Sequence, residues 1–191
     1  MTSVKENAIK EMKIAESNFF MVLNGIKPED ITKQVHPEVN TIAWIVGHLV
    51  SHMDAYQSIF TGKRHFSEEQ RKYFGYGSPK QTMEDGMPYS FVEIIDSYLE
   101  ISENYFKNLA ELPEENYDQI PPIEGFKESY LDLLHRISLH YMGHIGQIVL
   151  IRRMLGRTNK WSFVAGVSQK IRDQIFENWL EWWKSTKENF D

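Results

Sequence analysis

The chain has 191 residues, the length of one domain, and 41% of them are hydrophobic, which excludes an intrinsically disordered protein. Its 21 basic and 27 acidic residues leave a formal net charge of −6. This acidic balance argues against a nucleic-acid partner, which would require a broad basic surface. Because the chain contains no cysteine, disulfides, thiolate metal sites and a cysteine nucleophile are excluded.

The N-terminal residues MTSVKENAIKEMKIAE alternate charged and apolar side chains and lack the apolar core of a signal peptide. No stretch of the sequence approaches the ~18 uninterrupted apolar residues that a membrane span requires. We therefore expect a soluble cytoplasmic protein with no membrane partner.

Apolar residues recur at helical spacing in five segments of the chain. The predicted helices cover residues 6–23, 41–60, 90–112, 127–155 and 167–188. Asn40 is the predicted N-cap of the second helix, and Gly62 is its predicted end. Residues 62–88 are rich in charges and glycine, and we predict a long loop there, a kind of segment that is often functional.

The alternation that is typical of strands is weak everywhere, so the sequence predicts an all-α fold. We expect a single domain over residues 1–191. Its core is a four-helix bundle over about residues 5–157, and an additional helical extension covers about residues 160–191.

Two histidines lie four residues apart in the segment HYMGHIGQI, which comprises residues 140–148. At ~100° per residue, His140 and His144 lie about 40° apart on a predominantly apolar face of the fourth predicted helix. Two imidazoles stacked in this way can share one metal ion, or they can be buried rings with hydrogen-bond partners. His135 projects to the opposite side and is a poor candidate.

The second predicted helix also carries histidines on an apolar face. His48 lies on the same side as Trp44 and Ile45, and His52 is one turn further on. Gly47 and Gly143 each precede a histidine, and small residues allow helix backbones to approach closely. His48, His140 and His144 can therefore meet inside the bundle, with His52 as a group beside the ligands, a fourth ligand or a core histidine.

Three imidazoles with one open position are the usual arrangement of a catalytic zinc site. In a chain without cysteine, imidazole is the natural ligand for a divalent metal ion. Zinc is the first expectation, with nickel or iron(II) as alternatives.

Two segments carry a family resemblance. NTIAWIVGHLVSH in the second helix and HYMGHIGQIVLIRRML in the fourth resemble the two signatures of the DinB-like superfamily. This group includes the DinB proteins and bacillithiol S-transferases of the YfiT type. The resemblance implies a four-helix bundle whose metal ion is held by His48, His140 and His144, and it also implies a homodimer.

The resemblance further implies two classes of function. The first is a metal-dependent thiol S-transferase or hydrolase whose small-molecule substrates include a low-molecular-weight thiol. The second is a non-enzymatic metal-binding stress protein or small-ligand-binding protein. The sequence identifies no general base, although His52 is a candidate.

The C-terminal half holds two further patterns. The segment IRRMLGR places three arginines near a helix end, where they complement the helix dipole or form a site for phosphate or carboxylate. The segment NWLEWW predicts either a helix that covers a groove of the bundle or an apolar surface buried in a dimer.

Overall fold

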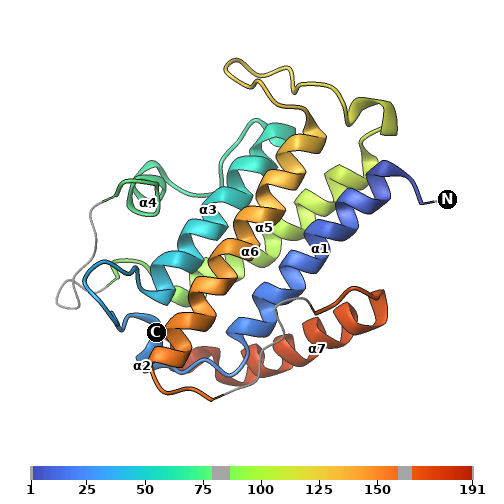
Figure 1. Ribbon diagram of the computed structural model, residues 1–191. Helices are drawn as coiled ribbons and strands as arrows, with labels where there is room; N and C mark the ends of the chain where they lie inside the picture. The colour runs from blue at the N-terminus through green and yellow to red at the C-terminus, as the bar shows by residue number, and fades with distance from the viewer. Residues whose placement is uncertain (1, 79–86, 159–164, 191) are drawn as a thin grey trace.

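The computed structural model of the protein describes residues 2–78, 87–158 and 165–190 (Figure 1). In these ranges the chain forms helices and no strands, which confirms the predicted all-α fold. The long helices are α1 (Val4–Leu23), α3 (Ile42–Thr61), α5 (Phe91–Glu111), α6 (Tyr130–Met154) and α7 (Gln169–Thr186). The short ones are α2 (Pro28–Ile31), α4 (Glu68–Tyr73) and the 3-10 turns η1 (Glu114–Asn116) and η2 (Lys187–Asn189). Among the helices described, none is long and apolar enough to cross a membrane.

The beginnings of the helices are set by side chains that accept hydrogen bonds from free backbone N–H groups. The predicted N-cap Asn40 is wrong, because the Thr41 hydroxyl accepts from the N–H of Trp44 and α3 begins one residue later. Helix α6 begins at Tyr130 and not at Lys127, since Ser129 and Asp132 form a capping box there. The predicted end of α3 at Gly62 is confirmed by its left-handed conformation.

The predicted loop over residues 62–88 contains the helix α4, which the sequence analysis missed. Ser67 and Gln70 form a capping box at the start of α4. The buried carboxylate of Asp54 on α3 accepts hydrogen bonds from the N–H groups of His65 and Phe66, at 2.7 and 3.1 Å, and so fixes the connection to α4. Residues 79–86 of the predicted loop lie outside the described part of the chain.

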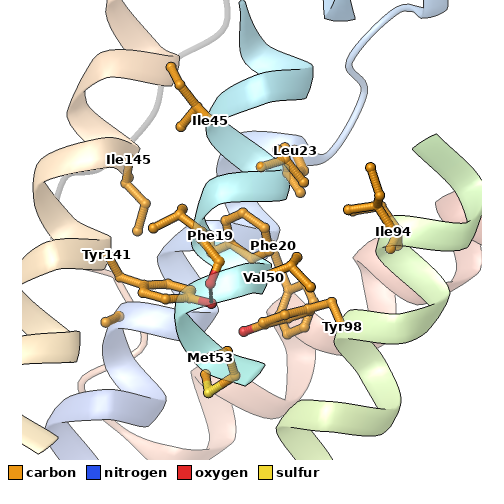
Figure 2. Packing of buried hydrophobic residues seen from close by; sticks show 14 of the residues in the cluster. Phe19, Phe20, Leu23, Ile45, Val50, Met53, Ile94, Tyr98, Tyr141 and Ile145 are labelled. Carbon is orange, nitrogen blue, oxygen red and sulfur yellow. Dashed lines mark hydrogen bonds between the residues drawn. The ribbon is translucent and has the colours of Figure 1, made fainter. Parts of the chain in front are cut away.

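Helices α1, α3, α5 and α6 form the bundle and enclose one apolar core. Helix α6 packs against both α1 and α3, and α3 also packs against α5 (Figure 1). Phe19 of α1 contacts Tyr98 of α5 and Tyr141 of α6 in edge-to-face arrangements, with ring centroids 5.0 and 5.7 Å apart (Figure 2). The Tyr141 hydroxyl donates to the carbonyl of Leu49 at 2.9 Å, so the centre of the core also fixes α6 relative to α3.

Helix α7 covers the outer side of α1, as the sequence predicted for a helix over a groove (Figure 1). Trp179 and Trp183 are buried, and the half-buried Trp182 packs against the same core. Trp179 and Trp183 are therefore covered within one chain, whereas Trp182 is only partly covered and Phe176 on the same helix is exposed. The homodimer stays a prediction.

Two of the C-terminal arginines have structural roles. Arg152 is 1% exposed, and its guanidinium donates to the carbonyl groups of Val22, Asn24 and Gly25 at the end of α1. Arg157 forms a bidentate pair with Asp30 of α2, with N···O distances of 2.6 and 2.7 Å. Both arginines therefore hold the C-terminal end of α1 and the following turn against the end of α6.

Replacing Arg152 by methionine is expected to lower the free energy of unfolding by on the order of 3 kcal/mol, because buried carbonyl groups lose their donor. Methionine keeps much of the buried apolar volume and removes the hydrogen bonds. Urea unfolding at neutral pH measures the loss, with the exposed neighbour Arg153→Met as the control. A loss for Arg152→Met no larger than that of the control would contradict the structural role.

Candidate metal centre

Helices α3 and α6 lie side by side (Figure 1). Their packing brings four histidine rings together. His48 and His52 project from successive turns of α3, and His140 and His144 project from successive turns of α6. The ring centroid of His48 lies 5.1 Å from that of His140 and 4.9 Å from that of His144. The centroids of His140 and His144 are 4.6 Å apart, and those of His52 and His140 are 4.3 Å apart.

The structure thus places all three predicted ligands in one cluster and adds His52 as an equal member. The donor nitrogens of His48, His52 and His140 lie within 4.8 Å of one another. This triplet differs from the predicted set, which has His144 in place of His52. Only His48 and His140 belong to both sets. His135 lies elsewhere, with its Nδ1 3.1 Å from a carboxylate oxygen of Glu11.

The spacing within the cluster suits a shared ion. The Nε2 atoms of His48 and His140 are 3.1 Å apart. Two imidazole nitrogens that bind one zinc ion at ~2.0–2.1 Å with a tetrahedral angle lie about 3.4 Å from each other. The two rings therefore need only a small adjustment to hold an ion between them.

His48 is the most buried member of the cluster, and a hydrogen bond from its Nδ1 fixes the orientation of its ring. Its Nδ1 lies 2.7 Å from the carbonyl oxygen of Phe74, which can only accept a hydrogen bond. Nδ1 therefore carries the proton, and the lone pair of Nε2 faces the other histidines. The Trp44 ring stacks on the His48 ring with centroids 4.8 Å apart, and its Nε1 donates to the carbonyl of Tyr73. A backbone carbonyl behind a ligating histidine is the usual outer partner in metal sites.

His144 has a comparable partner, Gln147, one turn further along α6. The distance from His144 Nδ1 to Gln147 Oε1 is 2.7 Å, which leaves Nε2 of this ring to act as a ligand as well. His52 forms no hydrogen bond with any residue of the described ranges. The hydrogen bond from His144 Nδ1 to Gln147 thus favours His144 as the third ligand. The short distances between the donor nitrogens of His48, His52 and His140 favour His52 instead.

Burial keeps the imidazoles neutral. Desolvation by burial, followed by repulsion from neighbouring histidines, lowers the pKa of His140 to about 3 and that of His52 to about 4. The pKa values of His48 and His144 are also lowered, in both cases mainly by burial. At neutral pH all four rings are therefore uncharged, so a metal ion does not have to compete with imidazolium protonation.

The cluster is accessible from the surface. His52, His140 and His144 are each partly exposed, and His140 borders a shallow hollow of about 570 Å³ that also includes Asp132 and Arg136. A small molecule in this hollow can therefore reach His140 from the outer side of α6.

With this geometry established, comparison with known families identifies the class of the protein. The family model of the DinB superfamily matches residues 11–148, which include all four histidines of the cluster. The chain therefore belongs to the DinB superfamily. No curated protein and no solved structure matches the chain. Family membership and the histidine cluster are together compatible with metal binding.

Proposed function

We propose that the protein binds a divalent metal ion through His48, His140 and His144 and uses it to activate a thiol or a water molecule. The observation that supports this proposal most strongly is the convergence of four neutral imidazoles from two adjacent helices at one partly exposed position. Zinc is the expected ion, with nickel or iron(II) as alternatives that imidazole also suits.

The choice of His144 as the third ligand depends on the outer partners of the rings. His48 and His144 each have an Nδ1 acceptor that orients the ring with its Nε2 lone pair free. His52 has no such acceptor among the described residues, and we assign it a place beside the open coordination position. There its neutral ring can accept a hydrogen bond from a bound thiol or water.

A bound zinc or nickel ion supplies Lewis acidity, which lowers the pKa of a coordinated thiol or water. The ligating histidines use their lone pairs for the ion, so they cannot also serve as general bases. Since the chain has no cysteine, the thiol of an S-transfer reaction must arrive as a cosubstrate. The hollow beside His140 is where we expect it to bind.

A non-enzymatic role is the second candidate, and the position of His52 favours it. If all four histidines bind the ion, the coordination shell is closed as in structural zinc sites. The protein would then act as a metal-binding or small-ligand-binding protein without turnover.

The enzymatic proposal predicts turnover that depends on both metal and thiol. Tag-free protein loaded with zinc or nickel is assayed for transfer of small thiols to 1-chloro-2,4-dinitrobenzene, and for hydrolysis of 4-nitrophenyl acetate. We expect one of these activities in the loaded protein, and a fall to the uncatalysed rate after chelation and in His140→Ala. His36→Ala, which removes an exposed histidine outside both the cluster and the hollow, is the control. Stoichiometric metal without either activity would favour the closed structural site.

A further inference from the structure

A second cavity lies between α1, α5 and α7. Its volume is about 660 Å³, which falls in the range of ~300–1,000 Å³ that small-molecule sites occupy. It shares no lining residue with the histidine cluster, which is built on α3 and α6. Helix α7 forms one wall of this cavity and lies beyond residue 148, where the match to the DinB superfamily ends.

The connection before α7 holds that wall in place. The side chain of Asn18 on α1 exchanges two hydrogen bonds with the backbone of Ala165, at 3.0 and 3.1 Å. Gly166 has a φ of +75°, and a Cβ there would lie 3.1 Å from Cβ of Ser17. At the other end of α7, the Trp183 Nε1 donates to Asp96 of α5. The cavity is therefore bounded by fixed elements at both ends of α7.

Much of the cavity lining is apolar and aromatic. Phe20 of α1, Phe106 of α5 and Phe176 of α7 contribute rings from three directions. The rings of Phe20 and Phe176 contact each other with centroids 5.1 Å apart, and both also contact the buried Trp179. Such a lining suits an apolar or aromatic portion of a ligand.

Three cations surround this apolar lining: Lys13, Arg172 and Lys184. Lys13 Nζ lies 5.3 Å from the centroid of the Phe106 ring, and Arg172 donates to the carbonyl groups of Gly166 and Val167. Over the ranges that the structure covers, no carboxylate forms an ion pair with any of the three. The exposed Glu103 and Asp173 also border the cavity without pairing with these cations.

The acidic group inside the cavity is Glu16. Its Oε1 accepts hydrogen bonds from the hydroxyl groups of Tyr98, at 3.0 Å, and Ser102. Burial raises the pKa of this carboxyl group, which reduces the negative charge that it would present to a ligand. The cavity thus combines aromatic walls with three cations that form no salt bridge in the described ranges. Its acids are the exposed Glu103 and Asp173 and the buried Glu16, whose charge is disfavoured by burial and favoured by Lys13.

We propose that the cavity between α1, α5 and α7 is a binding site for a small amphipathic organic anion, with its apolar or aromatic body between Phe20, Phe106 and Phe176 and its acidic group near Lys13 and Lys184. This site is separate from the metal centre and adds a ligand to the function proposed above.

The test uses three probes of one shape and different charge: 1-naphthylacetate, 2-(1-naphthyl)ethanol and 2-(1-naphthyl)ethylamine. By calorimetry we expect the anion to bind the full-length protein with a dissociation constant of about 100 μM, and the cation to bind at least about tenfold more weakly. Equal affinity for the anion and the cation would overturn the assignment of an anionic ligand. No binding of any probe up to about 1 mM would overturn the site itself.

Substitutions of residues that line the cavity test whether the probe binds there. Leu99 lines it, and Leu99→Trp is expected to fill it and abolish binding, whereas Leu150→Trp adds the same ring at an exposed position of α6. Lys13→Met and Lys184→Met should each weaken binding of the anion about threefold, while the exposed Lys170→Met should not. His48→Ala should bind the probe as the unmodified protein does, so failure of the metal proposal would leave this one standing. Unchanged affinity in Leu99→Trp would overturn the site.

Discussion

Replacing His48 by alanine is expected to weaken zinc and nickel binding by more than about 100-fold, the largest effect of any single substitution in the cluster. Loss of an outer partner of a ligand typically costs about 10- to 100-fold in metal affinity, and loss of the ligand itself should cost more. His48 belongs to both ligand sets that the structure allows, and it is the most buried of the four rings. Titration against a competing chelator, with elemental analysis of tag-free protein, measures the change.

The same titration assigns the third ligand. We expect His144→Ala to weaken binding as strongly as His140→Ala does, and His52→Ala to weaken it by about tenfold or less. His135→Ala is the control, because its ring pairs with Glu11 outside the cluster. The reverse ranking of His52→Ala and His144→Ala would make His52 the third ligand. Full affinity in His48→Ala would refute the metal centre.

Replacing Gly47 by alanine is expected to destabilise the protein by about 1–3 kcal/mol, the range found for overpacked cores. A Cβ at this position would lie 2.5 Å from Cδ1 and Cζ of the Phe74 ring and closer still to Cε1. The Phe74 ring is fully buried against Phe66 and Tyr89 and has little room to move. The carbonyl of Phe74 holds His48 Nδ1, so we also expect metal affinity to fall about tenfold.

Gly143→Ala is the matched control, because this glycine also precedes a histidine of the cluster. A Cβ at Gly143 would meet nothing within 4 Å, so alanine should stabilise α6 by about 1 kcal/mol through its helix propensity and leave metal binding unchanged. Urea unfolding and the chelator titration are run on both variants. A gain in stability for Gly47→Ala as well would contradict the predicted clash between a Cβ at position 47 and the Phe74 ring.

The two glycines looked alike in the sequence, and only the tertiary structure separates them. Both were predicted to permit a close approach of helices. At Gly47 the approaching group is the side chain of Phe74, which directly follows α4, whereas Gly143 faces open space. The identity of a neighbour that is 27 residues away in sequence is not encoded in the local pattern, and α4 itself lay within a predicted loop.

The sequence by itself determined the helical class, the approximate extent of the five long helices and the two helices that carry the histidines. The reason is that helical periodicity and the i, i+4 spacing of His140 and His144 are local properties. The predicted helix boundaries differ from the observed ones by up to three residues. Several nearby polar residues can cap a helix start, and only the structure shows that the hydroxyl groups of Thr41 and Ser129 do so.

The tertiary structure decided which group supports His48 and that His52 lies in the same cluster as His48, His140 and His144. The acceptor of His48 is a backbone carbonyl, which has no sequence signature, and the packing of α3 on α6 brings the ring centroid of His52 to 4.3 Å from that of His140. The packing of α7 on α1 likewise buried Trp179 and Trp183 and formed one wall of the second cavity. These features depend on how helices dock, and docking is set by the shapes of surfaces distant in sequence and not by the period of any one segment.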